Sequence, residues 1–335
     1  IFPSCGKLTA LKLLVKATEQ LKRLHAALLQ KAAEFDHVIK MGRTQLQDAV
    51  PIRLGQEFHA YAMAIGRDID RFIQAQDEMR FLNIGGTAIG TGLNADVAYL
   101  KKVAENISIV SGLQMHRAKD LIDATQNLDG YVAVSGTTKT CAVNLSKMAN
   151  DLRFMSCGPR CGINEIRLPP KQNGSSIMPG KVNPVIPEVV SQVAFNVIGN
   201  DLTITMAAEA GQLELNAFEP VIFYNLFHSI EQLEHVVKTF VDNCIIGIKA
   251  NVTHCQEMVD HSVGIITAIC PYIGYAKAAA LAKEAIESGA SVRDLILRDR
   301  LLNERELQVI FDPYALTKPG IAGLETMVQD GKYGR

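Results

Sequence analysis

Apolar residues recur at helical spacing over most of this chain of 335 residues, and that pattern constrains the fold more than any other feature. In residues 7–40 the apolar positions lie mostly three or four apart, which predicts one long helix that ends at Met41-Gly42. Further long helices are predicted for residues 54–81, 98–115, 120–156, 187–209 and 217–246. Strand signals are few, so we expect an all-α fold with a long central helical bundle.

The pattern of predicted helices changes after about residue 252. The predicted helices become shorter, and Pro and Gly return near the end; these helices cover residues 275–288, 291–297 and 304–311. We therefore expect a central helical-bundle domain over residues 1–252 and a small helical C-terminal domain over residues 253–335. Residues 187–209 are apolar nearly all round, which is typical of a helix buried inside a bundle or an oligomeric helical core.

Composition excludes several classes of function. The net charge is −1, and no basic stripe is interleaved with aromatics, so nucleic acid is not an expected partner. No apolar run reaches the length of a membrane span, so no membrane is expected either. Seven scattered Cys indicate free thiols in a reducing cytosol, hence a cytoplasmic protein. Cys157 and Cys161 lack a matching second pair, so we expect no metal site, and nothing indicates a cofactor.

Three polar inserts interrupt the helical pattern, at residues 42–51, 85–94 and 174–184. The second has the glycine content of a phosphate-binding loop, but such a loop follows a strand inside a βαβ unit. Because we expect helices on both sides of residues 85–94, we interpret this insert as a tight turn among packed helices.

Helix ends cluster at the poles of a bundle, so the three inserts can meet in space. They carry hydroxyls, amides and one lysine but no convincing His base: Thr44, Gln45, Thr87, Thr91, Asn94, Ser175, Ser176, Lys181 and Asn183. Such groups suit carboxylate binding. A Ser can act as a base there only if backbone N–H groups and a cation stabilise its alkoxide. Taken one by one, the same residues also fit ordinary turns and helix caps.

The insert Gly-Ser-Ser-Ile-Met-Pro-Gly-Lys-Val-Asn-Pro at 174–184 resembles the signature loop of the fumarase/aspartase superfamily. Residues 42–51 and 85–94 resemble two further blocks of that superfamily, in the same order, and the resemblance extends over essentially the whole chain. It implies a homotetramer with a shared helical core and active sites built from three subunits. Gln45, where fumarases usually carry His, and the stretch Val185–Val190 favour the aspartate ammonia-lyase branch. Residues 197–205, 209–216 and 312–323 favour the same branch.

The resemblance implies a reversible elimination of ammonia from L-aspartate to give fumarate. Ser175 would be the base that removes a proton next to the β-carboxylate, and an aci-carboxylate would form before ammonia leaves. Ser176, Lys181 and Asn183 would line the carboxylate site.

Two positions in the first insert, Thr44 and Gln45, match substrate-contacting positions of the superfamily. Glu188 matches a residue that pairs with the active-site His of fumarases. Because Gln45 replaces that His, we expect Glu188 to be a structural residue or one that supports the substrate contacts from behind.

The sequence leaves two other functions open. A fumarase-type hydratase and a non-catalytic structural protein of the same superfamily fit the same blocks. The superfamily also has two polar blocks upstream of the residue that matches Ile1. Since the chain begins with Ile, it is expected to be a fragment that is inactive unless another chain supplies them.

Overall fold

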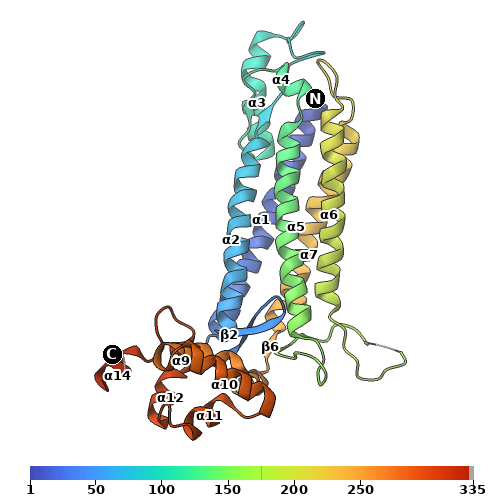
Figure 1. Cartoon of the computed structure of the whole chain (residues 1–335). Coiled ribbons are helices and arrows are strands. Elements are labelled where there is room, and N and C mark those ends of the chain that lie inside the picture. Colours follow the sequence, from blue (N-terminus) through green and yellow to red (C-terminus); the bar gives the residue numbers. More distant parts are fainter. Residues whose placement is uncertain (175, 332–335) are drawn as a thin grey trace. The chain divides into compact units, whose positions relative to one another are not determined.

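A computed structural model describes residues 1–174 and 176–331, and helices dominate it (Figure 1). The long helices are α1 (Phe2–Glu34), α2 (Leu54–Glu78), α5 (Asp129–Met155), α6 (Val185–Glu209) and α7 (Glu219–Asn243). This confirms the expected all-α class with long helices. No helix in the described part of the chain is long and apolar enough to cross a membrane.

The chain divides into two compact units. Unit 1 comprises Ile1–Leu28, Tyr61–Phe154 and Leu168–Ile248. Unit 2 comprises Leu29–Ala60, Met155–Arg167 and the residues from Lys249 onward. The division at 252/253 stays a prediction; unit 2 contains two earlier segments as well as the C-terminal helices.

Unit 1 is a bundle in which α1, α2, α5, α6 and α7 lie side by side (Figure 1). The apolar stripe of α1 is buried as its spacing predicts, with Leu11, Leu14 and Leu21 fully inaccessible. Thr18 is the polar residue in that stripe. Its hydroxyl donates to the carbonyl of Leu14 at 2.6 Å and accepts from the Gln76 amide at 3.0 Å, so its burial leaves no polar group without a partner.

The first helix ends earlier than predicted, and the difference is a β-hairpin. Helix α1 stops at Glu34, and β1 (Ile39–Thr44) pairs antiparallel with β2 (Gln47–Arg53). Ile39 and Met41 alternate along β1 and contribute to the core of unit 2. These apolar residues also fit a helical period, which is why the pattern extended the helix too far.

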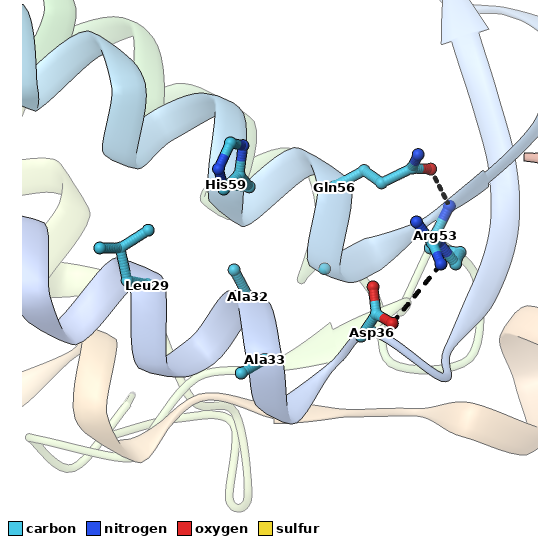
Figure 2. A pocket seen from close by; sticks show the side chains of 8 residues that line it. Leu29, Ala32, Ala33, Asp36, Arg53, Gln56 and His59 are labelled. Carbon is cyan, nitrogen blue, oxygen red and sulfur yellow. Dashed lines mark hydrogen bonds and ion pairs between the residues drawn. The ribbon is translucent and has the colours of Figure 1, made fainter. Parts of the chain in front are cut away.

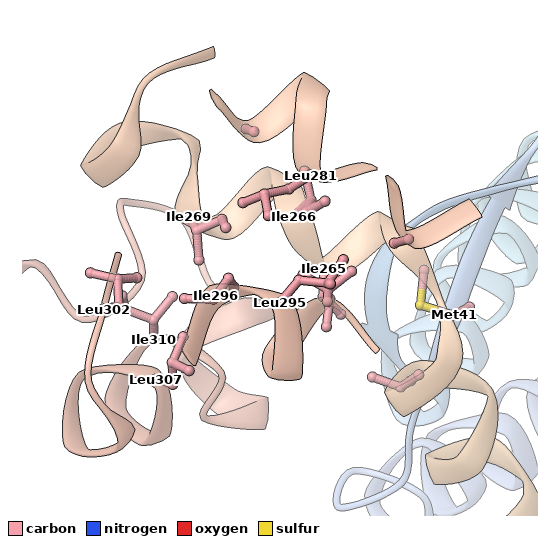
Figure 3. Packing of buried hydrophobic residues seen from close by; sticks show 14 of the residues in the cluster. Met41, Ile265, Ile266, Ile269, Leu281, Leu295, Ile296, Leu302, Leu307 and Ile310 are labelled. Carbon is pink, nitrogen blue, oxygen red and sulfur yellow. The ribbon is translucent and has the colours of Figure 1, made fainter. Parts of the chain in front are cut away.

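Unit 2 buries a second apolar core (Figure 3), in which Ile269, Ile296, Leu307 and Ile310 are fully inaccessible. Its helices are α8 (Val252–His261), α9 (Ile266–Ile273), α10 (Tyr275–Ser288), α11 (Val292–Arg298), α12 (Glu304–Ile310), α13 (Pro313–Leu316) and α14 (Leu324–Gln329). The three short helices predicted from the sequence correspond to α10, α11 and α12. Asn303 and Glu306 form a reciprocal capping box that fixes the start of α12.

The glycine-rich insert at 85–94 has one flank that differs from the prediction. A two-residue strand, β3 (Phe81–Leu82), precedes it and pairs in parallel with β4 (His116–Arg117), while α3 (Val97–Ser111) follows the insert. The N-terminus of α3 is nevertheless not an anion site. The Asp96 carboxylate already accepts from the backbone N–H groups of Ala98 and Tyr99 at 2.6 and 3.2 Å.

The backbone of this insert is a tight turn, as predicted. Gly85, Gly90 and Gly92 have φ of +89°, +95° and +72°. A Cβ added at Gly90 would lie 2.3 Å from the Cα of Ile122, so no side chain fits there. The remaining short elements are α4 (Asp123–Gln126), β5 (Ile166–Arg167) and β6 (Lys249–Ala250), and β5 pairs antiparallel with β6.

Glu219, in the first turn of α7, is a buried carboxyl that makes unit 1 sensitive to pH. The residue is 5% exposed, and its Oε1 has no hydrogen-bond partner among the described residues. Burial raises the pKa of this carboxyl from 4.5 to about 7. The folded state therefore holds the proton more tightly than the unfolded state. The resulting stabilisation is complete below pH 4.5 and is lost as the pH rises through about 7.

We expect Glu219→Gln to remove this dependence. At pH 8 the variant should be more stable than the parent by up to about 3 kcal/mol, and near pH 4 the two should match. Urea unfolding at the two pH values measures the difference. Glu214→Gln, at an exposed position close by in the sequence, is the control and should change stability by less than about 0.5 kcal/mol. An equal effect of Glu219→Gln at both pH values would contradict the assignment.

Candidate active site

The loop over residues 174–184 belongs to unit 1 and leads directly into α6. Ser175 lies outside the described residues. Gly174 approaches the other end of the loop so closely that an added Cβ would overlap the backbone carbonyl of Lys181. The Asn183 side-chain amide also donates to the Gly174 carbonyl at 3.1 Å. These two contacts close the base of the loop.

The described tip of this loop faces solvent. Ser176 and Lys181 are exposed, whereas Asn183 is half-buried at the closed base. The backbone N–H of Lys181 donates to the Met178 carbonyl at 3.2 Å, and Gly180 supplies the left-handed φ of +82° that this turn needs. No carboxylate in the described ranges pairs with the Lys181 ammonium, which leaves it available for an anion.

Glu188 lies in the first turn of α6. Its Oε1 is 3.7 Å from Nη2 of Arg153, near the end of α5. An acidic residue at this position also interacts favourably with the helix dipole. This solvent-exposed ion pair contributes little to stability, and the predicted supporting role of Glu188 in the site stays a prediction.

Thr44 and Gln45 lie in unit 2, at the tip of the β1–β2 hairpin. Thr44 pairs with Gln47, so Gln45 and Leu46 form a two-residue turn with φ of +52° and +62°. Such a turn favours Asn-Gly, and a left-handed non-glycine residue costs about 1–2 kcal/mol. Both residues are exposed. Strained backbone at non-glycine positions is concentrated at functional sites, which supports a binding role for Gln45.

A buried ion cluster, defined by Lys40, Arg43, Glu57 and Glu165, lies within unit 2 beside this hairpin. Glu165 is fully buried. Its Oε2 is 2.9 Å from Nζ of Lys40, and its Oε1 accepts from Nη1 of Arg43 at 2.5 Å. Lys40 also donates to Oε1 of Glu57 at 2.8 Å. Two cations and two carboxylates balance, which is the condition for burying charge at moderate cost.

The structure therefore groups the predicted residues by unit. Ser176, Lys181, Asn183 and Glu188 belong to unit 1, and Thr44 and Gln45 belong to unit 2. The ion cluster was not predicted from the sequence. Lys40, between two apolar residues of a strand, was a usable signal, but nothing in the sequence around Glu165 indicates a partner more than a hundred positions away.

Unit 2 also has an open pocket of about 570 Å³ that none of the predicted site residues lines (Figure 2). Its wall includes Leu29, Ala32, His59 and a long ion pair of 3.5 Å between Arg53 and Asp36. Gln56 accepts from the Arg53 backbone N–H at 3.0 Å, and the Arg53 side chain covers the ring of Tyr314. The Arg53 side chain thus contacts both the Asp36 carboxylate and the Tyr314 ring. In the described part of the chain, no group of three or more His, Cys, Asp or Glu side chains is placed to hold a metal.

The fold is a bundle of long helices with a loop closed at its base before α6, and comparisons with known proteins identify the family. The model of the family described as "Lyase" matches residues 6–199, and that described as "Fumarase C C-terminus" matches residues 265–318. The chain belongs to this lyase family, within the fumarase/aspartase superfamily, as its motifs predicted.

Relatives with curated names are close. The aspartate ammonia-lyase of Bacillus subtilis (strain 168) is 53% identical over 327 residues, which cover 98% of this chain and 69% of that protein. The aspartate ammonia-lyase of Helicobacter pylori (strain ATCC 700392 / 26695) is 52% identical over 318 residues, covering 95% of this chain and 68% of that protein.

Two solved structures share the fold. The fumarate lyase:delta crystallin from Brucella melitensis bound to cobalt has a TM-score of 0.91 and 46% identity, over 95% of this chain and 69% of that one. The recombinant class II fumarase from Schistosoma mansoni has a TM-score of 0.90 and 33% identity, over 95% of this chain and 70% of that one.

Proposed function

We propose that this protein is an ammonia-lyase that reversibly eliminates ammonia from L-aspartate to give fumarate. The observation that carries the proposal is the Gly174–Pro184 loop, closed at its base through Lys181 and Asn183 and exposing Ser176 and Lys181 to solvent. The identity of about half of all positions with proteins named aspartate ammonia-lyase supports it.

In the proposed reaction Ser175 is the base. Its alkoxide takes a proton from the carbon next to the β-carboxylate, and the electron pair moves onto that carboxylate to give an aci-carboxylate with two negative charges. The pair then returns to form the carbon–carbon double bond as the carbon–nitrogen bond breaks and ammonia leaves. Hydrogen bonds and a cation at the β-carboxylate stabilise this intermediate more than the substrate, which is what accelerates the step.

Each group proposed to hold the substrate offers a positive charge or a hydrogen bond to a carboxylate. Lys181 supplies the cation, and Ser176 supplies a hydroxyl or a backbone N–H. Asn183 uses one of its two amide hydrogens on Gly174, so one hydrogen and the amide oxygen remain for a ligand. Thr44 and Gln45 add a hydroxyl and an amide. Gln45 can donate a hydrogen bond to a carboxylate, but it cannot transfer a proton as a His would.

We also propose that the protein acts as a homotetramer with active sites composed of several subunits. Large apolar side chains on α6 are exposed in the isolated chain, with Phe195, Leu202 and Met206 each more than 60% accessible. An apolar surface of this kind on a central bundle helix is typical of an oligomer core. Light scattering coupled to gel filtration should give four chains per particle. A monomer would contradict the proposal.

A cytoplasmic location stays a prediction.

The identity of the product separates this function from the hydratase alternative. Fumarate is incubated with the protein in ammonium buffer and, separately, in ammonium-free buffer, and the products are identified by chromatography. We expect aspartate in the first reaction and no malate in the second. Malate as the main product would favour a fumarase-type hydratase, and no product from either reaction would favour the non-catalytic alternative.

A further inference from the structure

The buried ion cluster of unit 2 contacts the strand that leads to Thr44 and Gln45, so it can do more than stabilise the fold. Arg43 immediately precedes Thr44, and Lys40 lies three residues earlier on the same strand, β1. Both cations are held by the one carboxylate of Glu165, at 2.5 and 2.9 Å. A single fully buried side chain therefore fixes the strand at two points just before the turn that carries Thr44 and Gln45.

Glu165 is itself rigidly held. Its backbone N–H donates to the carbonyl of Met155 at 2.8 Å, and its own carbonyl accepts from the backbone N–H of Asn251 at 2.8 Å. The thiol of Cys255 approaches the same carbonyl at 3.6 Å. Glu165 thus links segment 155–167, which carries it, to the C-terminal helices and to the hairpin, all within unit 2.

Ile39 and Met41 pack the base of the hairpin into the core of unit 2, but its exposed turn lacks such an anchor. Its turn is built from Gln45 and Leu46, both left-handed without glycine, and its register shifts between Met41 and Arg43. A two-stranded hairpin is only marginally stable alone in water. Buried ion pairs contribute little to stability compared with well-packed apolar residues, and their better-attested use is to fix one geometry.

From these contacts we infer that Glu165 is a positioning residue of the active site: through Lys40 and Arg43 it fixes the turn so that Thr44 and Gln45 meet the substrate carboxylate. This inference rests on the function proposed above. Glu165 acts through the strand and does not touch the substrate.

The primary test is Glu165→Gln, which keeps the shape and removes the charge. We expect the KM for L-aspartate to rise by about 10- to 100-fold while kcat changes much less, because the ligand-holding groups are misplaced and the base is not. Hydrogen–deuterium exchange should accelerate at the amides of residues 44–47. Asp68→Asn is the matched control: Asp68 is also fully buried and paired, with Arg71 at 2.7 Å, but it lies in unit 1. It should lower stability and leave the KM unchanged.

A milder variant keeps the inference testable if Glu165→Gln does not fold. Arg43→Lys preserves the charge but removes the guanidinium fork, and it should raise the KM in the same direction. A wild-type KM and wild-type exchange at the turn in either folded variant would overturn the inference. Failure of both variants to fold would assign the cluster to stability alone and overturn it too. If the parent protein makes no fumarate, the proposed function fails, while the exchange measurement still decides whether Glu165 positions the turn.

Discussion

Replacing Ser175 by Ala should lower kcat for the conversion of L-aspartate to fumarate by about 10²- to 10⁴-fold, since the variant lacks the proposed base. The KM should change much less, because Lys181, Asn183, Thr44 and Gln45 remain to hold the carboxylates. Fumarate formation, followed by the ultraviolet absorbance of its conjugated double bond, measures both constants.

A serine outside the proposed active site provides the control for this variant. Ser288, exposed at the end of α10, donates its hydroxyl to the Glu284 carbonyl, and Ser288→Ala should keep the parent rate. A Ser175→Ala protein with the parent kcat would refute Ser175 as the base and would require another group for the proton transfer.

Replacing Gly174 by Ala should lower kcat/KM by about 100-fold or more although no reacting group is removed. The added methyl would overlap the backbone carbonyl of Lys181, so the loop must open at its base. Opening displaces Lys181 and breaks the hydrogen bond from Asn183 to Gly174. The loop tip is exposed, so the thermal midpoint should fall by only a few degrees.

Gly136→Ala in α5 is the matched control, because a Cβ there meets no atom within 4 Å in the chain. That variant should keep the parent activity and unfold at the same temperature or slightly higher. A Gly174→Ala protein with unchanged kcat/KM would show that the closed base of the loop is irrelevant to catalysis.

Helices could be predicted from this sequence because their signals are local. The hairpin could not, because it depends on contacts with distant parts of the chain. Long amphipathic stretches such as α2 and the capped short helices such as α12 carry local signals within a turn or two of the chain. Ile39 and Met41 satisfy both periods. They form strand because Ile39 and Met41 pack into the apolar core of unit 2, much of which is supplied more than two hundred residues later.

The same limit applies to the candidate site. The loop Gly174–Pro184 could be singled out because its glycines, prolines and polar groups are contiguous. The ion cluster could not be, because Lys40 and Glu165 come from distant segments and their pairing exists only in the folded unit. The close approach of Gly174 to Lys181 is likewise a property of the closed loop, although a glycine at its start was a visible hint.

The most direct test of the account is the forward reaction of the purified protein with L-aspartate, with fumarate and ammonia measured in the same sample. We expect both products to appear in equal amounts, D-aspartate to give neither, and Ser175→Ala to abolish most of the signal. Conversion of L-malate to fumarate, with no ammonia released from L-aspartate, would contradict it.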